Sequence, residues 1–81
     1  MLYKEMYILK MRVESMRIEI LLKEIRDKNS LSLDEVSKLT GISKSHLNYI
    51  EKNEKEPSLL VAVRIAQGLN IKIEELYKII Q

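Results

Sequence analysis

A single glycine, Gly41, lies between two short segments that each begin with a helix-capping residue. The first segment begins at Ser32 and has Glu35 three residues later. This is a capping box, in which the serine and glutamate side chains each bond a free backbone N–H of the first turn. The second segment begins at Ser43, a residue type that favours the position before a helix. Because glycine readily adopts the left-handed conformation that ends a helix, the sequence predicts two short helices joined by a tight turn.

The apolar residues of this unit lie on one side of each predicted helix, and polar residues lie on the other. We expect the inward-facing residues to be Val36, Leu39, Ile42, Leu47 and Ile50. The outward face of the second helix, within residues 43–52, carries Ser43, Lys44, Ser45, His46, Asn48, Tyr49 and Lys52. Lysine can bond guanine, and asparagine can bond adenine, at base edges in the major groove. Such a helix-turn-helix is typical of proteins that place the second helix in the major groove of double-stranded DNA.

Three predicted helices begin near a serine, at Ser32, Ser43 and Ser58. The first backbone N–H groups of a helix have no partner within the helix and carry a partial positive charge. These helix starts are therefore candidate sites for the phosphate groups of DNA. Asn53 follows the second helix of the unit and tolerates the positive φ that a helix end there requires.

Further helices are predicted on both sides of this unit, which gives five helices in about 60 residues. One runs from about Glu19 to the "DKNS" segment, one starts at Pro57-Ser58 and ends at Gly68, and the last runs from about Lys72 to Ile80. Their expected inward-facing residues are Leu21, Leu22, Ile25, Leu60, Val63 (or Leu59), Ala66, Leu76, and Ile79 or Ile80. The predicted fold is all-α, with residues 19–81 as the helix-turn-helix domain.

Residues 1–18 form an N-terminal extension whose pattern fits two structures. Tyr7, Leu9, Met11 and Val13 alternate with the residues between them, which predicts a strand. Leu2, Met6, Leu9, Val13 and Met16 share one face of a helix, which predicts a helix. Both alternatives stay open, and the extension is a possible dimerisation segment.

Composition excludes several other classes of protein. The chain has no cysteine and one histidine, so a disulfide or a thiolate zinc site is excluded and a transition-metal site is not expected. No paired carboxylates, nucleophile–base pair or phosphate loop is present, so we expect neither an enzyme, nor a cofactor, nor a small-molecule substrate. The N-terminus lacks the apolar run of a signal peptide or a membrane span, and we expect a cytoplasmic protein.

Several short motifs share the order and spacing of one known family. They are Leu22-Lys23-Glu24-Ile25-Arg26, Val36-Ser37, Thr40-Gly41-Ile42-Ser43, Ile50-Glu51, Pro57, Leu59, the run Ile65-Ala66-Gln67-Gly68-Leu69-Asn70-Ile71, and Glu75-Leu76. From about Ile20 to Ile80 the chain resembles the Cro/C1-type (XRE-like) helix-turn-helix family of phage repressors and bacterial transcriptional regulators. The resemblance implies a five-helix, lambda-repressor-like domain and a transcriptional regulator, most simply a repressor.

The resemblance also implies roles for individual residues of this chain. Lys44, Ser45 and Tyr49 correspond to residues that read base edges, with Asn48 beside them. Ser43, Lys52, Asn53 and Lys55 fall where the family contacts backbone phosphates. We expect the side chain of His46 to lie near phosphate as well. The resemblance also implies a structural role for Glu51, which holds the turn after the second helix of the unit.

Two features favour a different function on the same scaffold. Leu33 stands where the family usually has a glutamine that helps to anchor phosphate, which puts an apolar group near the expected DNA surface. Residues 29–81 carry seven Lys/Arg and seven Asp/Glu, and the net charge of +2 comes from residues 1–28, with seven and five. A DNA-binding domain usually has a clearer excess of positive charge. The alternative is a protein-interaction module, antitoxin-like or regulator-binding.

The expected form of the DNA-binding protein is a homodimer, because two-fold pairing doubles the contact with DNA and suits palindromic operators. Residues that could pair the subunits are Tyr3, Tyr7, Leu9, Met11 and Val13 in the extension and Ile73, Tyr77 and Ile80 near the C-terminus. We favour the extension, since a strand there would expose an edge able to pair with its twin.

Overall fold

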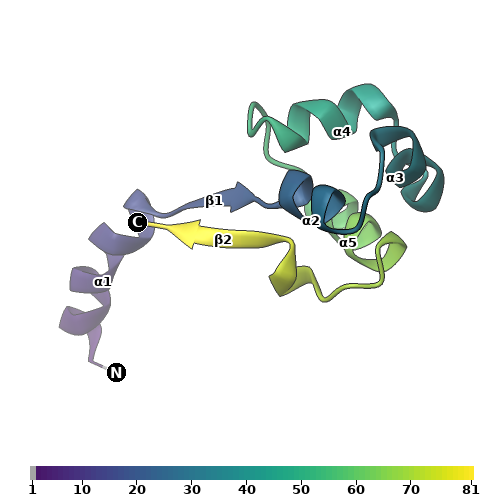
Figure 1. Ribbon diagram of the computed structural model, residues 1–81. Helices are drawn as coiled ribbons and strands as arrows, with labels where there is room; N and C mark the ends of the chain where they lie inside the picture. Colours follow the sequence, from purple (N-terminus) through teal and green to yellow (C-terminus); the bar gives the residue numbers. More distant parts are fainter. Residues whose placement is uncertain (1) are drawn as a thin grey trace.

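The computed structural model describes residues 2–81, and its elements are shown in Figure 1. In chain order they are α1 (Tyr3–Ser15), β1 (Arg17–Ile20), α2 (Leu22–Lys28), α3 (Leu33–Thr40), α4 (Lys44–Glu51), α5 (Leu59–Gly68), the 3₁₀ helix η1 (Ile73–Glu75) and β2 (Tyr77–Ile80). The expected all-α, repressor-like helix-turn-helix fold is confirmed, with a short two-stranded hairpin added to it.

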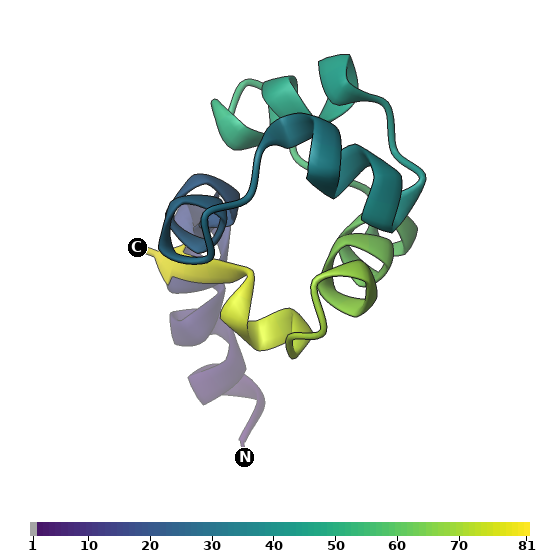
Figure 2. The same ribbon diagram turned by 45° about the vertical axis from the view of Figure 1, so that its right-hand side comes forward.

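The hydrophobic core lies between α2, α3, α4 and α5, which surround it in Figure 2. Side chains from every one of these helices, from β1 and from the segment before β2 contribute to it. The buried core residues are Ile20, Leu22, Val36, Ile42, Leu47, Ile50, Ile65 and Leu76. The expected burial of Val36, Ile42, Leu47, Ile50, Leu22, Ala66 and Leu76 is therefore confirmed.

The predicted capping residues define the two helices of the motif. Ser32 Oγ accepts a hydrogen bond from Glu35 N at 3.1 Å, and Glu35 Oε1 accepts one from Ser32 N at 3.0 Å, so the capping box is complete. Gly41 ends α3 with φ 72° in the left-handed region, where a side chain would be strained. Ser43 then begins α4, since its Oγ accepts from His46 N at 3.2 Å.

A second glycine allows α3 and α5 to approach closely. Gly68 has an ordinary helical backbone, but a Cβ placed on it would lie 2.7 Å from Thr40 Cγ2 and 2.9 Å from the Leu39 carbonyl oxygen. The backbone end of α3 therefore rests directly on α5, and its Leu39 side chain is 54% exposed, which makes the expected burial of Leu39 wrong. Thr40 is buried in its place.

The inward face of α5 differs from the expected one by one residue position. Leu60 was expected to be buried and is 67% exposed, and Leu59, the alternative to Val63, is 76% exposed. Val61 and Ala62 pack against the core instead, four residues before the buried Ile65 and Ala66. That i, i+4 spacing is as regular as the expected one, so periodicity alone did not separate the two faces.

The helix expected over residues 72–80 is wrong. Residues 73–75 form η1, and residues 77–80 form β2, which pairs antiparallel with β1 with Arg17 opposite Ile80 and Ile20 opposite Tyr77. Leu21 N also donates to the Leu76 carbonyl oxygen at 2.7 Å, which extends the pairing towards the body. The β-branched pair Ile79-Ile80 and Tyr77 suit a strand better than a helix. Ile79 is exposed and Ile80 half-buried.

Of the two alternatives for the N-terminal extension, the helix is confirmed and the strand is wrong. Residues 3–15 form α1, so the strand edge that was expected there to pair with its twin is absent from residues 3–15. The strand β1 follows at residues 17–20, so the helix expected from Glu19 begins only at Leu22. The expected boundary between residues 18 and 19 falls within β1. We call α1 with the β1–β2 hairpin the arm, and residues 21–76 the body. The arm projects from the body in Figure 1 and gives the molecule principal extents of 48, 23 and 22 Å.

Candidate nucleic-acid interface

The outward face of α4 is open to solvent. Lys44, Ser45 and Tyr49 are exposed, and Asn48 is half-buried beside them. The opposite side of the same helix carries Leu47 and Ile50, which are fully buried. In Figure 1, α4 forms one end of the body, on the side away from η1 and β2, and no other element lies over this face. The four expected base-reading residues are thus brought together on one accessible helix.

Lys44 has one charged neighbour within this face. Its Nζ lies 3.4 Å from Asp34 Oδ1, and both side chains are about 60% exposed or more. An ion pair this exposed stabilises the fold by about 0–1 kcal/mol, because water screens it. The ammonium of Lys44 can therefore leave Asp34 at little cost and bond another acceptor.

The residues expected near phosphate occupy two different environments. The hydroxyls of Ser32 and Ser43 cap their own helices, and the backbone N–H of His46 donates to Ser43, while its ring is half-buried. Lys52 and Lys55 are exposed in the segment after α4. The backbone of these helix starts and the two lysines border the open face of α4 from both ends.

Asn53 connects the interface to the arm. It has φ 58°, which confirms the expected positive φ after α4. Its Oδ1 accepts a hydrogen bond from Ile20 N, the last residue of β1, at 2.9 Å. One face of this side chain is therefore used within the fold, and the segment after α4 is tied to the outer edge of β1.

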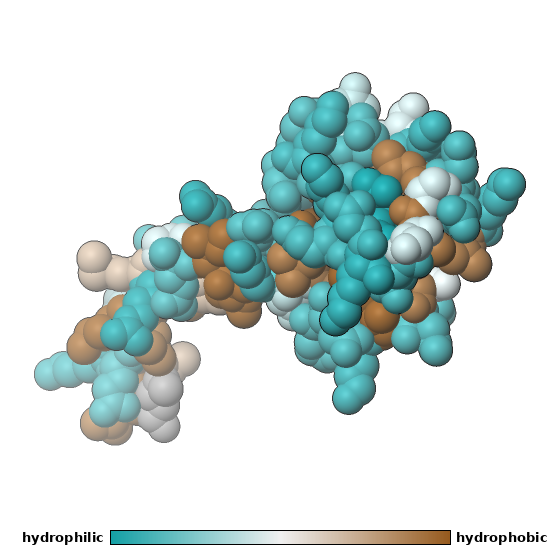
Figure 3. All heavy atoms as spheres, viewed as in Figure 1, coloured by the Kyte–Doolittle hydropathy of each residue, from teal (hydrophilic) through white to brown (hydrophobic). Residues whose placement is uncertain are grey.

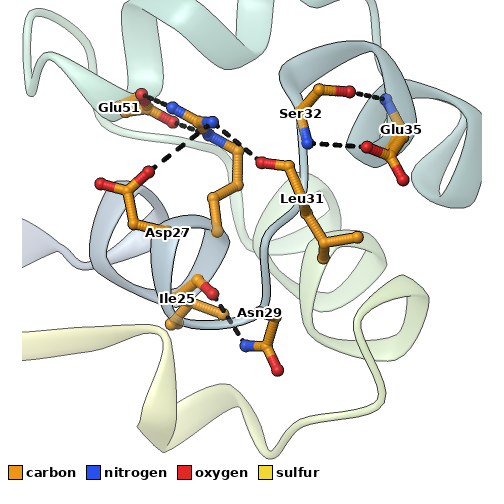
Figure 4. A network of polar contacts seen from close by, with 8 residues as sticks. Ile25, Asp27, Asn29, Leu31, Ser32, Glu35 and Glu51 are labelled. Carbon is orange, nitrogen blue, oxygen red and sulfur yellow. Dashed lines mark hydrogen bonds and ion pairs between the residues drawn. The ribbon is translucent and has the colours of Figure 1, made fainter.

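An ion pair fixes the end of α4 against α2, as Figure 4 shows. Arg26 Nη2 and Nε donate to the two carboxylate oxygens of Glu51 at 2.6 and 2.8 Å, and Arg26 Nη1 donates to the Leu31 carbonyl oxygen at 3.0 Å. The side chains are only 15% and 9% exposed. The hydrogen bond to Glu51 raises the pKa of Arg26 above its ordinary value. The structural role expected for Glu51 is confirmed.

Three polar residues that the sequence did not single out hold the turn between α3 and α4. Ser37 Oγ donates to the Ile42 carbonyl oxygen at 2.6 Å, and Thr40 Oγ1 accepts from Ile42 N at 3.2 Å. Arg64 of α5 donates to the Gly41 carbonyl oxygen at 3.4 Å. Serine and threonine near a helix end signal such bonds in general terms, but nothing local indicated that Arg64 would reach the turn from 23 residues away.

Leu33 exposes only part of its apolar side chain at the start of α3. As the first residue of α3 it is half-buried and packs against the core. The capping box places it there, because Ser32 and Glu35 fix the first turn and direct the intervening apolar side chain inward.

Two further properties of the described residues bear on other kinds of site. Residues 2–81 contain no cluster of three or more His, Asp or Glu side chains placed to hold a metal ion. In the same range, no helix combines the length and the apolar composition that a bilayer crossing requires.

Comparison with known proteins gives consistent matches over this region. Residues 22–76 match the helix-turn-helix family. The HTH-type transcriptional regulator SutR of Escherichia coli is 40% identical over 50 residues, which cover 62% of this chain and 28% of that protein. An uncharacterized HTH-type transcriptional regulator of Archaeoglobus fulgidus is 34% identical over 56 residues, 69% of this chain and 79% of the relative.

The matched span contains α2, α3, α4 and α5 together with η1, which is the whole helical body described above. The family consists of DNA-binding domains and not of enzymes. The Cro/C1-type resemblance is thereby confirmed, and the chain belongs to the helix-turn-helix family.

Proposed function

We propose that this protein is a cytoplasmic, sequence-specific regulator of transcription that places α4 in the major groove of double-stranded DNA. Lys44, Ser45, Asn48 and Tyr49 read base edges, and binding blocks a promoter, so the protein acts as a repressor. The two relatives reported above are described as transcriptional regulators, which supports a role for this protein in the regulation of transcription.

The observation that carries the proposal is an exposed polar face on a helix that is anchored at both ends. Arg26 and Glu51 fix the C-terminal end of α4 against α2. Ser37 and Thr40 fix the turn before its N-terminal end. A rigid helix loses little conformational entropy on binding, so little of the free energy of its contacts with bases is lost to ordering the helix.

Residues 29–81 have a net charge of zero, but this does not oppose the proposal, because the charged residues are unevenly distributed over the surface. Glu51 is almost fully buried and paired with Arg26. Glu74 and Glu75 lie in η1, on the side of the body away from α4, together with Lys72 before η1 and Lys78 in β2 (Figure 1). Without these four residues and Glu51, residues 29–81 carry five Lys/Arg and four Asp/Glu, so the part of the body that contains α4 has a small positive excess, which is the sign that contact with a phosphate backbone requires.

Contacts to phosphate are proposed for residues at the two ends of α4 and at the start of α3. Backbone N–H groups at a helix start and the ammonium groups of lysine are suited to this task. The proposed contacts are Ser32, Ser43, His46, Lys52, Asn53 and Lys55. The protein acts as a homodimer, which lets two copies of α4 occupy two half-sites of an inverted repeat.

The test is selection from random duplex DNA by the purified chain, with a Lys44→Ala/Ser45→Ala variant in parallel at the same salt concentration. We expect an enriched inverted repeat that the double variant no longer enriches. A Lys72→Ala variant is the control, because Lys72 is an exposed lysine beside η1. The Lys72→Ala substitution removes one positive charge and leaves α4 unchanged, so the variant should enrich the same DNA sequence as the parent.

A salt titration separates this function from the alternative of a protein-interaction module. For DNA binding, the logarithm of the binding constant falls against the logarithm of the salt concentration with a slope of about 0.9 for each phosphate contact. A folded chain that enriches no sequence and shows no such slope would support the protein-interaction module instead. The exposed apolar residues of the arm are the observation that favours that second function.

A further inference from the structure

The helix α1 has exposed apolar side chains that no other element among residues 2–81 covers. None of its residues is buried, and its exposed apolar side chains include Tyr3, Met6, Tyr7, Ile8, Leu9, Met11 and Val13. Figure 3 shows apolar patches on the arm, drawn in brown, interspersed with hydrophilic side chains drawn in teal. An isolated helix of 13 residues is marginal in water, because helices are stabilised mainly by packing an apolar face. The arm therefore needs a partner surface for its own order.

A second unpartnered apolar surface lies where the arm joins the body. It is a groove of about 400 Å³ between the hairpin, the start of α5 and the segment before β2. Its lining is almost entirely apolar and consists of Met16, Ile18, Ile20, Pro57, Leu59, Ala62, Ile73, Leu76, Tyr77 and Ile79. Leu59 and Ile79 are well exposed at 76% and 53%, so the rim of the groove is open. We call this surface the hairpin groove.

The helix α1 is poorly placed to cover the hairpin groove of its own chain. Only Met16 separates the end of α1 at Ser15 from the start of β1 at Arg17, and its backbone is extended. A helix that turns back over the strand that follows it usually needs a connection of about 2–6 residues. In Figure 1, α1 accordingly leads away from the body and not across it.

We infer that α1 of one copy of this chain occupies the hairpin groove of a second copy, and the reverse, in a reciprocal dimer. This specifies the pairing surface of the homodimer proposed above and rests on that proposal. An exchange of the same element between two copies gives a closed two-fold assembly. Each of the two surfaces has exposed apolar side chains and no partner within the part of the chain that the structure describes, so the two can cover each other.

The charges of the two surfaces agree with this arrangement, and their sizes indicate a small interface. Residues 3–15 carry three basic and two acidic side chains, a net charge of +1. The residues adjacent in sequence to the groove lining include three basic and four acidic side chains, a net charge of −1: Arg17, Glu19, Glu56, Lys72, Glu74, Glu75 and Lys78. The seven exposed apolar residues of α1 and the ten residues of the groove give at most 17 residues from each copy. A stable interface of standard size uses about 20–30 residues from each partner, so the expected interface is a small one.

Cysteine cross-linking tests this arrangement directly, because the chain has no cysteine of its own. A Leu9→Cys chain labelled with ¹⁵N is mixed with an unlabelled Leu59→Cys chain and treated with a short bis-maleimide. We expect a cross-linked species that contains one labelled and one unlabelled chain. As a matched control, Lys38→Cys replaces Leu59→Cys, since Lys38 is exposed on α3 and lies outside both surfaces.

Three other outcomes would overturn the inference. Cross-links only between two Leu9→Cys chains would mean that the α1 helices pair with each other. In a Leu9→Cys/Leu59→Cys double variant, cross-links only within one chain would mean that α1 covers its own groove. If a folded protein gave no cross-link above the Lys38→Cys control, the groove would not be the site for α1 of a second copy.

A charged substitution at the open rim gives an independent measurement. Leu59 is exposed in the single chain, so we expect Leu59→Glu to leave the body folded and to weaken the dimer at least about tenfold in sedimentation equilibrium. An unchanged dissociation constant would overturn the inference.

The inference and the proposed function can fail separately. Binding of a single half-site duplex reports on α4 without the dimer, whereas the cross-link reports on the dimer without DNA. A chain that cross-links but does not bind DNA would retain the interface and lose the proposed function. A chain that binds the half-site but does not cross-link would do the opposite.

Discussion

The body and the arm bury their apolar side chains in different ways. In the body, Leu47, Ile50, Ile65 and Leu76 are fully buried, and among the described residues no buried side-chain polar atom lacks a hydrogen-bond partner. In the arm, α1 buries no residue, and the hairpin attaches to the body through Ile20, Asn53 and Leu76. The comparison teaches that the helices of the body are stabilised by packing around a shared core, to which Ile20 of the hairpin also contributes, whereas α1 packs against no other described part of the chain.

Breaking the ion pair of the body should have the largest effect. In Glu51→Ala, the guanidinium of Arg26 stays largely buried without its carboxylate, which costs about 3–5 kcal/mol in the free energy of unfolding. Urea denaturation followed by far-UV circular dichroism measures this loss. The Arg26→Met/Glu51→Met variant should recover much of it. A single variant as stable as the parent would contradict the anchoring role of this pair.

Equivalent leucine truncations in the two regions sharpen the comparison. Leu47→Ala leaves a cavity in the core and should lower the free energy of unfolding by about 2–5 kcal/mol at every protein concentration. Leu9→Ala in α1 should cost less than about 0.5 kcal/mol where the protein is monomeric. Its cost should grow with protein concentration if α1 is buried in a dimer. Equal losses for the two variants in the monomer would mean that α1 belongs to the body.

Asn53 tests the connection between the two regions. Asn53→Ala leaves the buried backbone N–H of Ile20 without its acceptor and places alanine at positive φ, which together cost about 2–4 kcal/mol. Asn53→Gly keeps the backbone conformation and loses only the hydrogen bond, so it should cost about 1–3 kcal/mol. Hydrogen exchange at Ile20 N should be faster in both variants, and unchanged protection would rule out this contact.

The capping box should give the smallest effect. Ser32→Ala removes the hydroxyl that accepts from Glu35 N and should cost about 1 kcal/mol. The hydrogen bonds from Ser32 lower the pKa of Glu35 below its ordinary value. Ionised Glu35 therefore favours the folded state at neutral pH, and this contribution is lost as the pH falls through the lowered pKa. A Glu35→Gln variant should lose less stability than the parent between neutral and acidic pH in thermal unfolding scans.

The body was predictable from the sequence where local chemistry decides its structure. Ser32, Gly41 and Ser43 mark helix boundaries through bonds to residues within about one turn, and the structure has the helices in those places. The exposed face of α4 followed from the same boundaries. The inward face of α5 and the exposure of Leu39 depend on how closely Gly68 lets two helices approach, which no local pattern expresses.

The arm was less predictable because its structure depends on residues distant in the chain. Residues 77–80 have apolar side chains at helical spacing, but they become a strand because β1, about 60 residues earlier, offers free backbone groups. The bonds of Arg64 to the turn and of Asn53 to Ile20 likewise join segments 23 and 33 residues apart. Arginine and asparagine side chains can form such hydrogen bonds, but the sequence does not indicate which distant backbone group each one reaches.

The hydrogen bond of Asn53 to β1 has a consequence for the spacing between the two half-sites that a dimer would bind. The end of α4 is bonded to β1, and β1 passes into α1 through one extended residue. In a dimer that pairs through the arm, the length of the hairpin would thus set the distance between the two copies of α4. Lengthening both strands by two residues should change the preferred spacing between half-sites and leave the sequence of each half-site unchanged.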